Sequence, residues 1–458
     1  MKLASATEAR KAIDKYGPEA SAEWHRLDCF EAYYAGLHRP PYEPETATRE
    51  FKELARRSVS NLLRLIVNTM TQRLVVDGFR PSETSVENAP QWSWWQANGL
   101  DARQKALYDE AAKLGYAGCL VMKPVEGPAP VMRPVSPREW WLGFEDYMDD
   151  WAFLALRKTD EDTWQILDDD VLWTVTTRGG DPVIEEEHGL GHVPIVPFRN
   201  QWNMSHYPDG EIAPAIAIQD RLNQTVFDLL VAQTYAAAPQ KWASGLVMDT
   251  DANGRPIVDV RAFARSLWAT SDPNARFGAI PEANLHNVVE AIEQCLRTYG
   301  LMTQTPPHYL LGDLVNLSAE ALLAADTTLA KKVADRQVLF GESWEQTFRL
   351  AGVAANDKAA AADTEAQVWW RDTEPRSIAQ QVDALGKLAT MLQVPVTALW
   401  ERVPGVTGSD LALWRTEAAR VRFQAARSAL TQTVSGGPNT GTPGANVEAA
   451  QGRAQAVG

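Results

Sequence analysis

Apolar side chains recur at helical spacing in the first quarter of the chain. Their separations of three, four and eight residues place them on one face of a single amphipathic helix. The residues concerned are Phe51, Leu54, Leu62, Ile66, Met70 and Leu74. The turn Asp77-Gly78 is expected to end this helix. A second helix is predicted over residues 101–114, with Asp101 as its N-cap and Gly115 as its stop.

The pattern changes between residues 117 and 198. Short runs rich in Val, Trp, Leu and Thr, at 118–123, 151–157 and 171–177, alternate with turn residues such as Gly127-Pro128. Turns recur roughly every ten residues, which is typical of an antiparallel β meander.

Helical patterns return in the second half. Helices are predicted at 211–237, ended by Pro239, and at 283–301. The adjacent prolines Pro306 and Pro307 are expected to exclude helix from residues 303–312.

The longest helix is predicted at 318–350, about 50 Å if continuous. Ser318 is a suitable N-cap, and Gly341 is a candidate kink. Two further helices are expected at 377–392 and 409–430. The tail from 435 to 458 has almost no large apolar residue and is expected to be disordered.

Composition changes this picture in one respect. With 458 residues the chain can hold two or three cores. Acidic residues outnumber basic ones 59 to 44, which gives a net charge of −15. A protein that grips DNA by its phosphates is normally basic, so the charge disfavours a conventional DNA binder. It is compatible with a wall along which DNA slides.

The cysteines and the hydropathy indicate a cytosolic place of synthesis and assembly. Cys29, Cys119 and Cys295 are widely spaced and indicate free thiols. The segment 1–16 is charged and helical in pattern, unlike a signal peptide. Runs of apolar residues long enough to span a membrane are not expected.

Candidate catalytic and metal-binding motifs have simpler structural interpretations. The clusters Asp149-Asp150 and Asp168-Asp169-Asp170 are predicted to be hairpin turns, since neighbouring side chains diverge and do not converge on a metal. His188 and His192 have the spacing of a metal-ligand pair but lack further ligands nearby. No phosphate-binding loop of the GxxxxGK[ST] type occurs, which excludes an ATP-driven motor of that kind.

Tryptophan is abundant, with 17 residues, several of them adjacent. Stacking platforms for nucleic acid are usually interleaved with Lys and Arg, and here they are not. Core and subunit-interface anchors are therefore the favoured interpretation.

The order of these elements, together with several short motifs, resembles the portal proteins of siphovirus-type tailed bacteriophages. The similarity runs across nearly the whole chain, to about residue 430. The motifs are Tyr33-Tyr34-Ala35-Gly36-Leu37-His38, Leu74-Val75-Val76-Asp77-Gly78-Phe79, the stretch from His188 to Asn200, Leu222-Asn223, Pro239-Gln240-Lys241, the stretch from Thr305 to Gly312, and Asn316-Leu317-Ser318-Ala319-Glu320-Ala321.

The resemblance implies a mainly helical α+β portal fold. Its parts would be a wing with an antiparallel β meander, two stem helices, a small α/β clip, a long kinked helix and a helical crown. By position these would be wing 1–210, stem helix 211–237, clip 238–283, stem helix 284–302, tunnel loop 303–317, long wing helix and connection 318–376, crown 377–430 and disordered tail 431–458.

The resemblance also implies a function. The chain would form a ring, commonly a dodecamer, at one capsid vertex, through which double-stranded DNA is packaged and ejected without base readout. Its implied partners are further copies of itself, the terminase large subunit, a head–tail adaptor, and the major capsid and scaffolding proteins. It would reside in the virion, and in the host cytoplasm during assembly, as a structural protein without enzyme activity, cofactor, metal or membrane contact.

Two sets of residues become candidate DNA-channel residues. Asp220, Gln224 and Asp228 share one face of the first stem helix and, repeated around a ring, would give the bore a phosphate-repelling potential. A solvated outer face is the equal alternative.

The implied tunnel loop supplies the second set, Thr305, Pro306, Pro307, His308 and Tyr309. Within it His308 and Tyr309 are candidates for the nearest approach to DNA, or for packing against a neighbouring loop.

Two other functions are alternatives. A minor capsid or adaptor protein is one, although adaptors are generally shorter and have no use for a long helix behind a proline loop. A metal-dependent nuclease is the other, and it predicts that alanine replacement of residues 168–170 abolishes activity.

Overall fold

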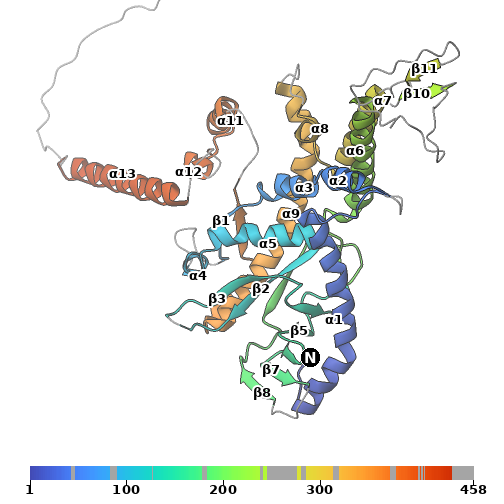
Figure 1. The fold of residues 1–458 in the computed structure, drawn as a ribbon. Helices are drawn as coiled ribbons and strands as arrows, with labels where there is room; N and C mark the ends of the chain where they lie inside the picture. The colour runs from blue at the N-terminus through green and yellow to red at the C-terminus, as the bar shows by residue number, and fades with distance from the viewer. Residues whose placement is uncertain are drawn as a thin grey trace, which may run out of the picture. The chain divides into compact units, whose positions relative to one another are not determined.

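The computed structural model of the chain describes residues 1–42, 47–82, 90–125, 127–177, 183–237, 241–244, 276–279, 285–312, 319–371, 378–400, 403, 406 and 408–435. The chain divides into two compact units, Met1–Pro375 and Arg376–Gly458 (Figure 1). Helices and antiparallel sheets both contribute, so the α+β class is confirmed. Of the predicted disordered tail, residues 431–435 are helical, which contradicts the prediction there, and the rest lies outside the described residues. Most of the predicted clip lies outside them as well.

The first unit begins with the long helix α1 (Ala6–Ala35), which runs along a five-stranded sheet (Figure 1). Ser5 caps its start by accepting from Glu8 N, and Gly36 ends it in the left-handed region. Ile13 of α1 and Leu3 before it pack against Trp141 and Trp164 of the sheet in a shared core.

The five-stranded sheet confirms the predicted meander, because its spatial order is its sequence order, β4-β5-β6-β7-β8, with every pair antiparallel. The strands are Trp141–Gly143, Leu154–Lys158, Thr163–Leu167, Val171–Thr176 and Ile184–Glu187. A separate three-stranded sheet has the order β3-β2-β9, from Val131–Val135, Tyr116–Met122 and Ile195–Arg199.

The predicted helix at 101–114 is present as α5 (Leu100–Leu114), preceded by α4 (Pro90–Ala97). The stop at Gly115 is confirmed, since this residue has φ +102°. The N-cap is wrong: Gly99 occupies that position, and the Asp101 carboxylate instead accepts from Trp95 Nε1.

The single helix predicted through Phe51 and Leu74 is also wrong, because two helices form, α2 (Arg49–Arg57) and α3 (Leu63–Thr71). The backbone between them bonds to side chains of a distant helix: Ser60 N donates to Asn223 Oδ1 and Leu62 N to Gln219 Oε1. Those bonds replace the helical ones and break the helix.

The predicted turn Asp77-Gly78 lies inside a strand. β1 (Val76–Arg80) pairs antiparallel with β12 (Gln367–Trp370), and the register shifts between Val76 and Gly78. A glycine within a strand often marks such an irregularity.

The predicted stem helices are α6 (Ile216–Ala237) and α7 (Leu285–Thr303), which lie side by side (Figure 1). Helix starts later than residue 211 because the short 3₁₀ turn η1 (Ala213–Ala215) precedes α6. The strands β10 (Lys241–Ser244) and β11 (Arg276–Ala279) pair antiparallel in the predicted clip.

Helix was not expected at 303–312, yet α8 (Pro307–Leu311) forms there. Pro306 is its N-cap and Pro307 its first residue, a position where the missing N–H costs no hydrogen bond. α9 (Ala319–Ala354) is the long helix, followed by α10 (Lys358–Ala362). The N-cap Ser318 lies outside the described residues, and the kink at Gly341 stays a prediction.

The main core lies where α3, α5 and α9 meet the three-stranded sheet. Within it Trp95 meets Trp344 edge to face and Tyr108 stacks on Phe340, so core packing of these aromatic residues is confirmed. The second unit contains α11 (Ile378–Met391), α12 (Val396–Leu399) and α13 (Gly408–Ser435), of which α12 was not predicted.

The three cysteines are unpaired, with Cys29 exposed and the others buried. Within the described ranges, none of the helices combines the length and the apolar character that a membrane span requires.

Candidate functional site

Asp220, Gln224 and Asp228 do share one face of α6, since Gln224 Nε2 donates to Asp228 Oδ1 over 3.0 Å. The N-terminal segment covers part of this face. Tyr33 Oη donates to both Asp220 oxygens at 3.2 and 3.0 Å, and Tyr42 N donates to Gln224 Oε1. Of the three candidates only Asp228 is exposed.

Arg221 is exposed on the same side of α6, seven residues before Asp228 and therefore two turns away. The exposed part of this face thus carries both signs of charge. The predicted phosphate-repelling face of Asp220, Gln224 and Asp228 did not include this arginine.

The predicted tunnel loop begins as a buried turn. Thr303 Oγ1 donates to Tyr299 O and lies 3.0 Å from Thr305 Oγ1, while Thr305 N donates to Gly300 O. Thr305 and Pro306 are buried, whereas Pro307 and Tyr309 are exposed.

His308 and Tyr309 both contact charged groups of the first unit. His308 Nε2 lies 3.5 Å from Asp326 Oδ1 of α9, and its ring packs against the tilted ring of Tyr309 with 4.3 Å between the centroids. Arg73, which follows α3, donates from Nη2 to Tyr309 Oη at 3.1 Å and to Asp326 Oδ2 at 3.0 Å. The side chains of Arg73, Asp326 and His308 are 11 to 12% exposed.

A buried charge network joins the start of the stem to α9. Glu211, just before η1, accepts from Lys332 at 2.5 Å and from Arg336 at 2.7 Å. Burial alone would raise the pKa of Glu211, but the two cations outweigh it and the pKa lies below its usual value. Lys332 also donates to Thr303 O at the end of α7, and Arg336 to Asn200 Oδ1 after β9.

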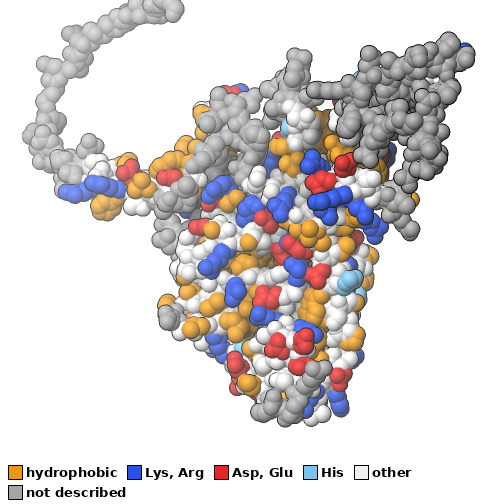
Figure 2. Space-filling view, in the orientation of Figure 1, with side chains coloured by type: hydrophobic (Ala, Val, Ile, Leu, Met, Phe, Trp, Pro, Cys, Tyr) orange, Lys and Arg blue, Asp and Glu red, His pale blue; other side chains and the backbone are white. Residues whose placement is uncertain are grey.

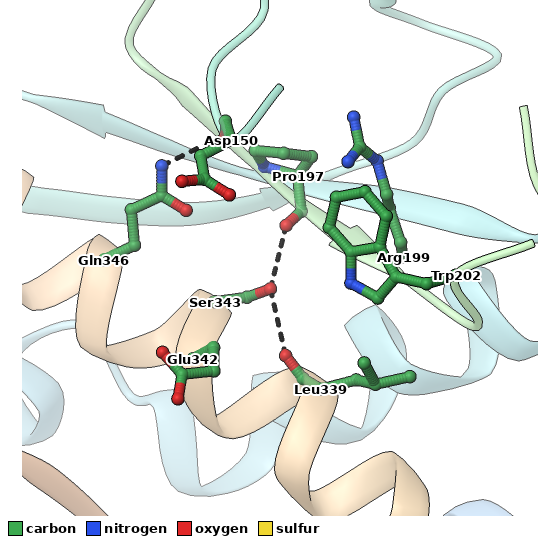
Figure 3. A pocket seen from close by; sticks show the side chains of 8 residues that line it. All are labelled: Asp150, Pro197, Arg199, Trp202, Leu339, Glu342, Ser343 and Gln346. Atoms are coloured by element: carbon green, nitrogen blue, oxygen red, sulfur yellow. Dashed lines mark hydrogen bonds between the residues drawn. The ribbon is translucent and has the colours of Figure 1, made fainter. Parts of the chain in front are cut away.

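A small pocket of about 50 Å³ separates β9 from α9 (Figure 3). Ser343 Oγ lies 2.9 Å from Pro197 O, and Gln346 Nε2 donates to Asp150 O. Arg199 lies between the Phe144 and Trp202 rings, 4.2 Å from each, and burial lowers its pKa to about 10. This volume is far below that of typical ligand pockets. We interpret the pocket-lining residues as packing contacts between α9 and β9.

The turn interpretation of the acidic clusters is confirmed. Asp168–Asp170 connect β6 to β7, and Asp168 Oδ1 accepts from Asp170 N and Val171 N. Asp149 closes a turn with Asp146 between β4 and β5. Over the described parts of the chain, His, Cys, Asp and Glu side chains do not gather in threes around a possible metal position.

His188 and His192 have different neighbours. His188 Nε2 faces Asp168 O at 3.2 Å, whereas the His192 ring stacks on Trp151 at 4.3 Å. Each ring thus has its own packing role.

The net negative charge is not evenly spread. Figure 2 shows Lys and Arg side chains concentrated where α2 lies in Figure 1. The exposed basic residues of that helix are Arg49, Lys52, Arg56 and Arg57.

In this fold, buried charges tie a helix pair and a short proline-led helix to one long helix. A model of the family described as "Phage portal protein, SPP1 Gp6-like" matches residues 14–422. The chain therefore belongs to the phage portal protein family, whose members are structural proteins.

Two relatives are named portal proteins. The portal protein of Mycobacterium phage L5 is 26% identical over 381 residues, which cover 78% of this chain and 77% of the relative. The portal protein of Mycobacterium phage D29 is 26% identical over 348 residues, covering 71% of each.

Two solved structures with similar chains are described as the virion of a native gene transfer agent particle and the neck of an empty gene transfer agent particle. The first has a TM-score of 0.45 and 11% identity, and covers 82% of this chain and 98% of that one. The second has a TM-score of 0.41 and 12% identity, and the match covers 81% of this chain and 96% of that one.

Sequence reasoning missed both charge networks. Lys332 and Arg336 lie four residues apart, next to the apolar Val333. This spacing could have indicated that both cations face the core. Arg73 and Asp326 gave none, since 253 residues separate them.

Proposed function

We propose that this chain is the subunit of a ring, commonly a dodecamer, at one capsid vertex, through which double-stranded DNA is packaged and ejected. The observation that carries the proposal is the family match over residues 14–422, which includes the proposed wing from residue 14 on, the stem, clip and tunnel loop, and nearly all of the proposed crown. Terminase, a head–tail adaptor, and the capsid and scaffolding proteins are the partners that such a ring requires.

The division into parts belongs to the same proposal. Residues 1–210 form the wing, α6 and α7 the stem, 238–283 the clip, 303–317 the tunnel loop and 377–430 the crown. The contacts of Glu211, Lys332 and Thr303 support it, because they fix both stem helices to α9 at the end from which the tunnel loop leaves.

Native mass spectrometry and negative-stain imaging of the purified chain test the ring. A closed ring with a central hole as wide as a DNA duplex is expected. A chain that stays monomeric at every protein and salt concentration, or that forms open filaments, contradicts the proposal.

We further propose that the α6 face bearing Asp220, Gln224 and Asp228 lines the bore, with Asp228 its most accessible acid. The test replaces the exposed Cys29 by Ser and introduces Asp228→Cys. A thiol-reactive reagent should label the introduced thiol in empty particles and much less in DNA-filled ones.

Glu161→Cys, on the exposed β5–β6 turn, serves as the matched control and should be labelled equally in both kinds of particle. Equal labelling at position 228 in both states would place this face on the outside of the ring.

A further inference from the structure

The helix α8 has only five residues, Pro307–Leu311. A helix this short is unstable alone, so contacts with the rest of the chain must set its position. Its start is fixed by the buried turn at Thr303 and Thr305, which Lys332 reaches through Thr303 O. Its other half needs a separate anchor.

Arg73 and Asp326 supply that anchor from two different segments. Arg73 donates to Tyr309 Oη and to Asp326 Oδ2, at 3.1 and 3.0 Å, so one guanidinium joins α8 to α9. Both members of the ion pair are about nine-tenths buried, with 12% and 11% of their side chains exposed. Such a pair is screened by solvent far less than a surface pair.

Asp326 uses its two oxygens differently. Oδ2 accepts from Arg73, while Oδ1 faces His308 Nε2 at 3.5 Å and has no hydrogen-bond partner among the described residues. One carboxylate on α9 therefore contacts both the arginine after α3 and the histidine of α8.

We propose that Arg73 and Asp326 are positioning residues that clamp α8 and thereby set where Pro307 and Tyr309, two exposed residues of the proposed tunnel loop, meet DNA. The role in DNA contact rests on the proposed function; the clamping of α8 does not.

The test measures the mobility of α8 in the assembled full-length protein. Cys29 is replaced by Ser and a nitroxide is attached to the introduced thiol of Pro307→Cys. Asp326→Asn and Arg73→Ala should each increase the mobile fraction of the spectrum several-fold at a temperature where the protein stays folded. Arg73→Lys should restore part of the immobile signal, because it keeps the charge and loses the planar fork.

Two controls separate clamping from general destabilisation. A nitroxide at Glu161→Cys should report the same mobility in every variant. Glu53→Gln, which removes a carboxylate from an exposed pair with Arg57, should leave the Pro307 label unchanged.

Tyr309→Phe is the mildest variant, because it removes only the oxygen that accepts from Arg73. It should shift the spectrum in the same direction by a smaller amount. If neither Tyr309→Phe nor Asp326→Asn raises the mobility of the Pro307 label, the clamp does not exist.

A second readout tests the DNA contact itself. A benzophenone on the same introduced thiol should cross-link to packaged duplex in wild-type background, with a several-fold lower yield in Asp326→Asn. If the label responds as expected but no variant cross-links, the clamp stands and the placement of this loop beside DNA is wrong. An unchanged cross-link yield in Asp326→Asn overturns the positioning role.

Discussion

Arg336 Nη2 donates to Glu211 Oε1 over 2.7 Å, which joins the long helix α9 to the residue that precedes the first stem helix. Lys332, one turn earlier on α9, reaches the other oxygen of the same carboxylate and also the last carbonyl of α7. The Glu211 carboxylate and its two cations therefore hold the segment before α6 and the end of α7 against α9.

Removing this carboxylate should be strongly destabilising. Glu211→Gln keeps the size of the side chain but leaves Lys332 and Arg336 buried without a negative partner, and we expect a loss of about 3 kcal/mol in the free energy of unfolding. Denaturant titration followed by tryptophan fluorescence measures it. Glu53→Gln, in an exposed pair, should change the value by less than about 0.5 kcal/mol.

The same carboxylate predicts an acid transition. Its folded pKa lies below the usual glutamate value of 4.5, so its contribution to stability is present above about pH 4.5 and is lost as pH falls through the folded pKa. Wild-type stability should drop as the pH falls below about 4.5, and the curve of Glu211→Gln should be flatter there. Parallel curves would show that other groups govern acid unfolding.

The sequence predicted those elements whose signal is local. The meander β4 to β8, the helices α5 and α9 and the turn at Asp168–Asp170 follow from periodicity and turn chemistry within a few residues. Elements set by distant contacts were missed. The break between α2 and α3 depends on Gln219 and Asn223, and β1 depends on its pairing with β12.

In the candidate site, too, local features could be predicted and long-range contacts could not. The common face of Asp220 and Asp228 follows from helix geometry alone. That Tyr33 covers Asp220 depends on a contact across 187 residues, and no local pattern indicates it. The helix α8 contradicts the prediction for another reason, because Pro307 begins a helix at this position instead of excluding one.

Glu345 on α9 should produce the opposite pH dependence. Burial, aided by the charge of Glu342, raises its pKa from 4.5 to about 7, while Val368 N–H donates to it over 3.3 Å. The folded protein then binds an extra proton between these values, so stability falls as pH rises through that window. Glu345→Gln should be more stable than wild type at pH 8 by about 1 kcal/mol, after allowance for partial solvent screening, and should show little gain at pH 4.

Thermal unfolding of the two proteins at both pH values measures this difference. Glu342→Gln is the matched control, because that neighbour is exposed and should give a smaller effect. An equal gain at both pH values would point to packing and not to ionisation.

Gly115 should not tolerate a side chain. Its φ is +102°, and a Cβ there would lie 1.9 Å from Pro208 O, so Gly115→Ala adds a backbone clash to an unfavourable conformation. A loss of about 4 kcal/mol or failure to fold is expected. Gly127→Ala shares a positive φ of +75° but meets nothing within 4 Å, so its cost in denaturant titrations should be about 1 kcal/mol.

Asp168 distinguishes a structural turn from a nuclease site. Its carboxylate is fully buried and accepts four hydrogen bonds, from Leu3 N, Asp170 N, Val171 N and Trp173 Nε1. Asp168→Ala leaves these donors without an acceptor and should lower the free energy of unfolding by about 3 kcal/mol or more. Asp168→Asn keeps one acceptor oxygen, so its free energy of unfolding should lie between those of the wild type and Asp168→Ala.

Asp170→Asn is the control for this series, since it removes the charge from a solvent-exposed pair with Lys2 and should change stability far less than Asp168→Ala does. Denaturant midpoints are measured beside DNA cleavage in the presence of magnesium. The structural role predicts that stability follows the number of acceptors lost and that cleavage is absent throughout. Wild-type cleavage that disappears in a fully stable Asp168→Ala protein would instead support catalysis at this turn.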